Sequence, residues 1–268
     1  MSSRQSGEAW VIIETRNQEF AVSASHVREV VVMPEITSLP CCPSQHRGVI
    51  NLRGRILPLV DMRKQFGWQS VPEEQEEFYK LMGQREQDHR NWLEALEKSV
   101  AEGAEFRLAR DPRQCAFGQW YYSYRSESPW ITALLRKFEG PHGKIHALAS
   151  SIDQLTRNGE NAEAMRLIEN ARQGVLREMV SLFQDLKKLM RETVKELAMV
   201  IATDRGGFAV SIDRVVGVER IPADRIEELH TGSALFDGRH VHRAAKRGAK
   251  GALAMILEVG LFMPASSH

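Results

Sequence analysis

The 268-residue sequence has only three cysteines, and it has no apolar run long enough to cross a membrane. So few cysteines argue against a disulfide framework and favour a cytoplasmic protein. The first nine residues are polar and acidic, which argues against a secretion signal. The formal net charge is only +1, so neither nucleic acid nor direct insertion into a membrane is expected.

The metalloprotease motif H-E-x-x-H is also missing, although four residues that can bind a metal stand in the middle of the chain: His89, Cys115, His142 and His146. On a helix the last two share a face, with Cβ atoms about 5–6 Å apart. Zn²⁺ takes imidazole and thiolate ligands in a tetrahedral shell. A fourth protein ligand would close that shell, so a structural or sensory zinc is favoured over catalysis. A zinc enzyme, which needs an open position and a general base, is the less favoured alternative.

Helical periodicity fills the middle of the sequence. Apolar residues recur at steps of three and four over residues 73–100, and Gly103 is expected to stop this helix. His89 lies on that apolar stripe and therefore is expected to point into the bundle. A second long helix is predicted over residues 161–197, with a narrow apolar seam that suits a bundle or a coiled-coil-like partner. With the helix of His142 and His146, these segments predict a four-helix bundle holding the metal in its core.

The two ends of the chain read as strands, and they repeat. The sequence Phe-Ala-Val-Ser occurs at residues 20–23 and again at residues 208–211, and the valines and proline that follow keep the same offset of 188 positions. Such self-similarity predicts two similar small β-barrels from one duplicated unit. Cys41 and Cys42, next to Pro43, are expected to pack at a turn and are left out of the zinc site.

Residues 115–122 read C-A-F-G-Q-W-Y-Y, which resembles the C-x-F-G-x-W-x-Y run of the chemoreceptor zinc-binding (CZB) domain. The resemblance covers about residues 75–195 and implies a zinc site made by the three histidines and Cys115. It also implies that Cys115 reacts with oxidants, above all hypochlorous acid. Zinc would hold this cysteine as the reactive thiolate, and oxidation would weaken it as a ligand. Zinc level is a competing stimulus, and a purely structural zinc is a further alternative.

Residues 48–61 read G-V-I-N-L-R-G-R-I-L-P-L-V-D, which resembles the CheW adaptor of bacterial chemotaxis over about residues 8–70 and 196–264. The resemblance implies two five-stranded barrels that link chemoreceptor cytoplasmic tips to the CheA histidine kinase, without catalytic residues. It also implies that Glu29 meets Arg53. A bidentate contact of this kind would hold the turn at Asn51, Leu52, Arg53 and Gly54 in shape and support a docking surface.

These observations predict an α+β protein: a CheW-like pair of small five-stranded β-barrels with an inserted α-helical, zinc-binding four-helix bundle. The expected domains are residues 1–70 and 196–268 for the CheW-like domain and residues 71–195 for the insert. The expected function is that of a non-enzymatic chemotaxis adaptor with Zn²⁺ as cofactor and Cys115 as redox sensor. The seam of the last helix and the resemblance favour a homodimer through the bundle.

Overall fold

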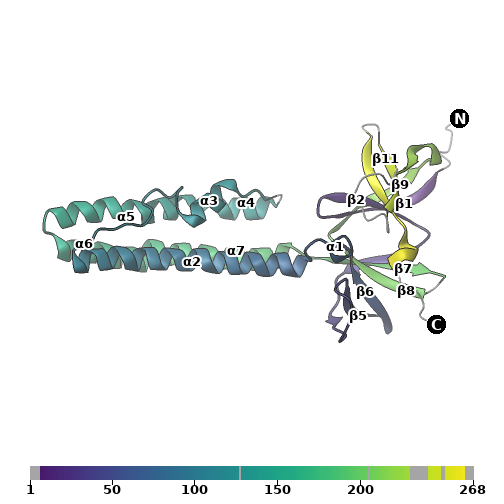
Figure 1. The fold of residues 1–268 in the computed structure, drawn as a ribbon, viewed down its shortest axis with the longest axis horizontal. Coiled ribbons are helices and arrows are strands. Elements are labelled where there is room, and N and C mark those ends of the chain that lie inside the picture. Colours follow the sequence, from purple (N-terminus) through teal and green to yellow (C-terminus); the bar gives the residue numbers. More distant parts are fainter. Residues whose placement is uncertain (1–6, 127, 205, 230–240, 249–250, 263–268) are drawn as a thin grey trace. The chain divides into compact units, whose positions relative to one another are not determined.

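The protein divides into two compact units in a computed structural model that describes residues 7–126, 128–204, 206–229, 241–248 and 251–262. One unit joins residues 1–71 to residues 195–268, and the other is formed by residues 72–194 (Figure 1). The first is built from strands and is called the β unit below. The second is the helical unit. In the described part of the chain, no helix has both the length and the apolar character that crossing a membrane requires.

Within its described residues, the β unit contains two sheets of six strands each. The first has the order β9 (Arg214–Ile221), β1 (Glu8–Thr15), β2 (Gln18–Ser23), β12 (Ala252–Leu257), β11 (Val241–Arg247), β10 (Ile226–Glu228). The second has the order β3 (Val27–Val32), β7 (Leu197–Thr203), β8 (Gly206–Ile212), β6 (Arg55–Asp61), β5 (His46–Leu52), β4 (Ile36–Thr37). Neighbours are antiparallel except for the pairs β2–β12 and β6–β8. The α+β fold with a helical insert is therefore confirmed, with six strands in each sheet where five were expected.

The two sheets reproduce the internal repeat of the sequence, with one exchange. Strands β1, β2 and β3 correspond to β7, β8 and β9, and the two sheet orders match position by position. The third strand of each repeat, however, pairs in the other sheet: β3 lies against β7, and β9 lies against β1. The repeat was predicted from the offset of 188 positions, whereas this exchange of strands was not.

Strand burial follows the same repeat. Val11, Ile13 and Phe20 of the first copy lie in one core with Met199, Ile201 and Phe208 of the second. The alternate residues of these strands face away from this shared core, since successive side chains of a strand point to opposite faces. They form one smaller core on each sheet, around Trp10 and Ile12 on one and around Ala198 and Val200 on the other. Burial on both faces explains why these strands are almost wholly apolar.

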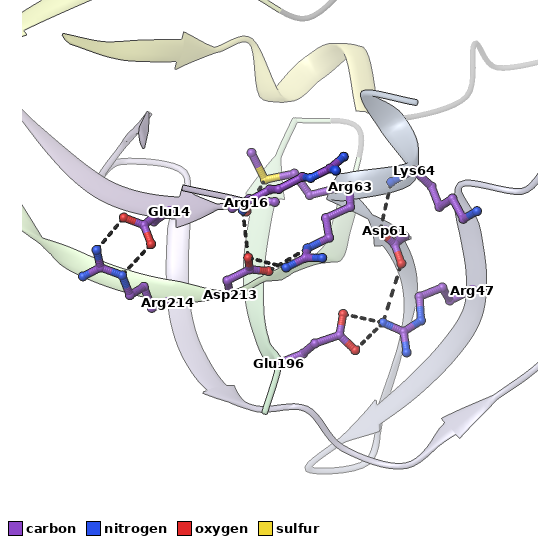
Figure 2. Close-up of polar contacts among 11 residues, drawn as sticks. Glu14, Arg16, Arg47, Asp61, Arg63, Lys64, Glu196, Asp213 and Arg214 are labelled. Atoms are coloured by element: carbon purple, nitrogen blue, oxygen red, sulfur yellow. Dashed lines mark hydrogen bonds and ion pairs between the residues drawn. The ribbon is translucent and has the colours of Figure 1, made fainter. Parts of the chain in front are cut away.

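A polar cluster in the β unit lies next to the chain segments that flank the helical unit (Figure 2). Arg47 on β5 donates through Nη1 to both carboxylate oxygens of Glu196, at 2.8 and 2.7 Å, and lies 3.7 Å from Asp61. Asp61 caps the short helix α1 (Met62–Gln65) by accepting from the Lys64 amide. Glu196 directly precedes β7. Arg47 therefore joins the segment before the helical unit to the segment after it.

The helical unit is a bundle with two long helical segments. One is α2 (Val71–Glu102). The other consists of α6 (Asn161–Ala171), a π-helical turn at Arg172–Leu176 and α7 (Arg177–Thr193). The remaining side of the bundle is shared by α5 (Glu139–Arg157) and by the short helices α3 (Ala116–Ser123) and α4 (Pro129–Arg136) (Figure 1). Near the start of α2, the Phe78 ring contacts those of Trp120 and Tyr124 in the α3 segment, besides that of its neighbour Tyr79.

Of the two predicted helix ends, one is confirmed and the other is wrong. The first long helix ends where predicted, with Gly103 in the left-handed region at a φ of 64°. The second was predicted to reach Leu197 but ends at Thr193, because Leu197 pairs with Val32 and Ile212 as the first residue of β7. Its apolar seam packs inside the bundle, with Met179, Leu182, Phe183 and Leu186 in the core. The bundle interpretation of the seam is therefore confirmed, and the seam is not a free surface for a second copy.

Candidate metal centre

The four predicted ligands come together in the helical unit, with their ligand atoms all within 4.8 Å of one another. His89 stands near the middle of α2, Cys115 is the N-cap of α3, and His142 and His146 lie on the first turns of α5. The closest recorded approach is 3.2 Å between Cys115 Sγ and His142 Nε2. Three separate segments thus place one sulfur and three imidazole rings around one point.

Backbone carbonyls orient two of the imidazole rings. His89 Nδ1 is 2.7 Å from the Arg85 carbonyl oxygen, and His146 Nδ1 is 3.0 Å from that of Ala109. A carbonyl oxygen only accepts hydrogen bonds, so Nδ1 carries the proton in both rings and Nε2 keeps its lone pair. Metal-binding histidines commonly have such a partner behind the ring. The arrangement prepares both Nε2 atoms to bind a metal.

The buried nitrogens show that a metal fits this donor set. His89 Nε2, His142 Nδ1 and His146 Nε2 are buried and have no hydrogen-bond partner. Buried polar groups are nearly always satisfied, and leaving one unsatisfied costs about 1–3 kcal/mol. The Nε2 atoms of His89 and His146, together with the His142 Nε2 that lies 3.2 Å from Cys115 Sγ, offer three nitrogens beside one sulfur. A cation that takes nitrogen and sulfur ligands suits this set, and zinc is the ordinary choice for three histidines and one cysteine.

Burial sets the protonation of the site. It lowers the pKa of His142 from 6.5 to about 3, with the neighbouring His89 and His146 adding to the effect, and it lowers the pKa of His146 to about 4. These rings are therefore neutral at pH 7 and able to bind a metal. Burial also raises the pKa of the Cys115 thiol, although the Gly118 amide hydrogen bond opposes the rise. Cys115 becomes a thiolate in this site when a cation neutralises its charge.

The residues around Cys115 explain why its sequence motif contains Phe117 and Gly118. Phe117 is fully buried, and its ring lies 5.0 Å from that of His142 and 5.6 Å from that of His89. A Cβ atom on Gly118 would fall 1.8 Å from the Pro112 carbonyl oxygen, so no larger residue fits without moving the backbone. The Gly118 amide also donates to Cys115 Sγ at 3.2 Å. Both residues hold the cysteine in place.

Sequence reasoning missed the carbonyl groups behind the rings. The Ala109 carbonyl accepts from His146 and also from Trp92 Nε1 at 2.7 Å, so that one backbone oxygen fixes two rings. Ala109 lies in an irregular segment between α2 and α3, and a backbone acceptor there leaves no trace in residue type. The Arg85 carbonyl could have been found, because it stands four residues before His89 on a predicted helix.

The residues expected to support docking lie in the β unit. Asn51 and Leu52 end β5, and Arg53 and Gly54 form the two-residue turn to β6, with φ of 54° and 83°. Positive φ at both positions is the signature of a type I′ hairpin turn. Asn51 Oδ1 accepts from the Gly54 amide at 2.9 Å.

Glu29 and Arg53 are brought together, as the resemblance implies. Arg53 Nη2 lies 3.1 Å from Glu29 Oε2, and the Arg53 side chain is 79% exposed. An exposed pair of this kind contributes little stability. The turn is shaped chiefly by Gly54 and Asn51. The expected packing of Cys41 and Cys42 is wrong, because both are exposed.

Comparisons with known proteins agree with both resemblances. The sequence model of the CheW-like domain family matches residues 9–88, and that of the chemoreceptor zinc-binding domain family matches residues 89–152. The chain is 36% identical over 65 residues to the chemotaxis protein CheW of Rhizobium meliloti, which is 24% of this chain and 42% of that protein. It is 35% identical over 66 residues to the probable chemotaxis protein CheW of Rhizobium etli, 25% of this chain and 43% of that protein.

These matches span about two fifths of the length of each of these relatives. Among solved structures, the scaffolding protein TtCheW of Thermoanaerobacter tengcongensis aligns over 97% of this chain and 94% of its own, with 13% identity and a TM-score of 0.46. The predictions of the two domain families and of zinc as cofactor are confirmed. Neither family description names an enzyme.

Proposed function

The chain carries a CheW-like domain and a chemoreceptor zinc-binding domain, and we propose that it is a chemotaxis adaptor whose helical unit is a zinc–cysteine sensor. In this proposal the β unit links chemoreceptor cytoplasmic tips to a CheA-type histidine kinase. The CheW names of its relatives and the exposed hairpin turn at Arg53 support this role. Residues 1–70 with 196–268 form the adaptor domain, residues 71–195 form the sensor domain, and the protein acts in the cytoplasm.

The sensor role is carried by one observation. Three buried histidine rings converge with the sulfur of Cys115, which alone of the four residues is only half-buried, and the Nε2 atoms of His89 and His146 have no hydrogen-bond partner. His89, Cys115, His142 and His146 would hold Zn²⁺, which keeps the cysteine as a thiolate when bound. Hypochlorous acid can reach this sulfur and oxidise it, and a sulfenic acid is a weaker ligand. The adaptor would then respond through the connection between the two units.

Three other interpretations make different predictions. A purely structural zinc would leave Cys115 inert to mild oxidants, and a sensor of zinc level would respond to chelators but not to oxidation. A zinc enzyme would need an exchangeable ligand, which four protein ligands do not leave. A homodimer remains part of the proposal on the strength of the resemblance alone, since the seam of α6 and α7 is taken up by the bundle.

The test combines metal analysis with binding. Purified protein should contain about one zinc per chain, and it should capture a CheA regulatory domain and a receptor tip fragment. Mild treatment with hypochlorous acid should change one of these affinities by about five-fold or more, given the usual coupling of about 1–3 kcal/mol. The Cys115→Ser variant should bind both partners and lose the response. Protein that captures neither partner would refute the adaptor role, and unchanged affinities after oxidation would refute the sensor role.

A further inference from the structure

A cavity of about 490 Å³ lies beside the metal centre, and Cys115 forms part of its wall. Residues of α2 also line it, among them Arg85 and Asp88. A water molecule occupies about 30 Å³ in the liquid, so the cavity admits a small oxidant and leaves room for an oxygen atom added to the sulfur. An oxygen added to Cys115 can therefore share this cavity with the side chains of Arg85 and Asp88.

Arg85 is the only arginine or lysine among the twelve described residues that line this cavity. Its Nη1 donates to Asp88 Oδ2 at 2.7 Å, and its side chain is mostly buried. Its Nε is buried without any hydrogen-bond partner. An N–H donor left in this condition is unfavourable, and it is available to an acceptor that enters the cavity.

We propose that Arg85 is the positioning residue for oxidised Cys115, and that its Nε–H binds the oxygen which oxidation adds to the sulfur. This inference rests on the proposed sensor function. The chemistry starts from a thiolate and a hypohalous acid. The sulfur attacks chlorine, the S–Cl bond forms, the Cl–O bond breaks and hydroxide leaves. Water then displaces chloride, giving a sulfenic acid and a proton. Sulfur loses two electrons, and chlorine gains them.

The sulfur side chain then has two arrangements. In the reduced protein the sulfur lies among the three histidines. In the oxidised protein its oxygen accepts a hydrogen bond from Arg85, which is charge-assisted and therefore strong. A signal requires the two states to differ in free energy for metal or partner binding, and Arg85 supplies a part of that difference by stabilising only the oxidised arrangement.

The experiment measures how far oxidation weakens zinc binding. All measurements use the 268-residue chain with the background substitutions Cys41→Ser and Cys42→Ser, which leave Cys115 as the only thiol. Zinc affinity is measured by chelator competition before and after one equivalent of hypochlorous acid, and dimedone labelling with mass spectrometry confirms the sulfenic acid. In the Arg85→Met variant the ratio of the two affinities should shrink about ten-fold, which equals about 1.4 kcal/mol. The lifetime of the sulfenic acid should shorten too.

A matched control is Arg90→Met. Arg90 lies on the same helix and pairs with Glu86, but it is not part of the cavity wall, so its loss should leave the ratio unchanged. In Arg85→Met the Asp88 carboxylate is left without its cation. The double variant Arg85→Met/Asp88→Asn removes this carboxylate as well and should show the same smaller ratio of zinc affinities as Arg85→Met. Arg85→Lys keeps the charge without the Nε donor and, if Arg85→Met fails to fold, it carries the test with an expected partial loss.

The outcomes separate the two proposals. If Cys115 in the otherwise unchanged protein resists hypochlorous acid, or is oxidised without weaker zinc binding, the sensor function is wrong and the inference on Arg85 is wrong with it. If that protein responds and the Arg85 variants respond equally, only the inference on Arg85 is overturned. An equal loss in Arg90→Met would also overturn it, because the effect would then be one of general helix charge.

Discussion

Arg47 donates to both carboxylate oxygens of Glu196, at 2.8 and 2.7 Å, across 149 positions of sequence. The intervening chain contains the whole helical unit. Burial raises the pKa of Glu196, and the Arg47 bond opposes the rise. Arg47 therefore favours the charged form of a buried carboxylate at the place where the chain returns from the helical unit to the sheet.

Arg47→Met should destabilise the β unit, because Glu196 and the buried Asp61 would lose their cation. Breaking a buried ion pair on one side costs about 3–5 kcal/mol. Hydrogen exchange measured by mass spectrometry should show lost protection in β5 and β7. The exposed Arg53→Met should cost no more than about 1 kcal/mol. Equal protection in Arg47→Met and the unaltered protein would contradict this role.

Removing a zinc ligand should release the metal. Cys115→Ala and His146→Ala each remove one bond to zinc, so metal analysis after dialysis against a chelator should find well under one zinc per chain. Cys42→Ala is the matched control, since Cys42 is exposed and lies in the other unit. Full retention of zinc by Cys115→Ala would show that the ligands are assigned incorrectly.

Gly118→Ala should disturb the cysteine without touching any ligand. The added Cβ would fall 1.8 Å from the Pro112 carbonyl oxygen, so the backbone around Cys115 must move and zinc affinity should fall at least ten-fold. Gly83→Ala on α2 meets nothing within 4 Å and should instead raise stability by about 0.5–1 kcal/mol. Chelator competition and thermal melting measure the two effects. Unchanged zinc affinity in Gly118→Ala would show that the close approach of Pro112 does not position the cysteine.

The metal-free protein should lose stability in acid. The pKa of His142 is lowered from 6.5 to about 3 and that of His146 to about 4, so the unfolded chain takes up protons first as the pH falls. The contribution of these two histidines to the free energy of unfolding is fully present above pH 6.5 and is lost below it. At pH 5 the loss is up to about 2 kcal/mol for each histidine. Thermal melting in chelator at pH 7.5, 6 and 5 tests this. In the His146→Ala variant the melting temperature should fall less steeply with pH. Equal slopes for the variant and the unaltered protein would contradict this prediction.

Deleting residues 72–194 and joining the ends with a short flexible linker should leave a folded β unit. Its three cores contain only residues of that unit, and Arg47 already holds Asp61 and Glu196 on either side of the junction. Circular dichroism should show a cooperative strand transition, and the protein should still capture the CheA regulatory domain. A shortened protein that stays unfolded would mean that the helical unit contributes to the stability of the sheets.

The sequence predicted those features that depend on local spacing or on the internal repeat. The four-residue step from His142 to His146 and the apolar stripe that carries His89 follow from helix periodicity, and the correspondence of Phe20 with Phe208 follows from the repeat. Features that depend on distant backbone were missed. These include the pairing of β3 with β7, the strand at Leu197 and the Ala109 carbonyl. Backbone groups are alike in every residue, so composition says little about which ones meet.

The exchange of β3 and β9 also determines when this protein can fold during synthesis. Neither sheet has its full set of neighbours until strands from both ends of the chain exist, because β1 needs β9 and β12 completes the sheet beside β2. The helical unit is complete by Val194 and needs none of them. The ribosome adds about 5–20 residues per second, so the first six strands are synthesised on the order of ten seconds before the strands with which they pair. The metal-binding bundle therefore leaves the ribosome and folds before the domain into which it is inserted.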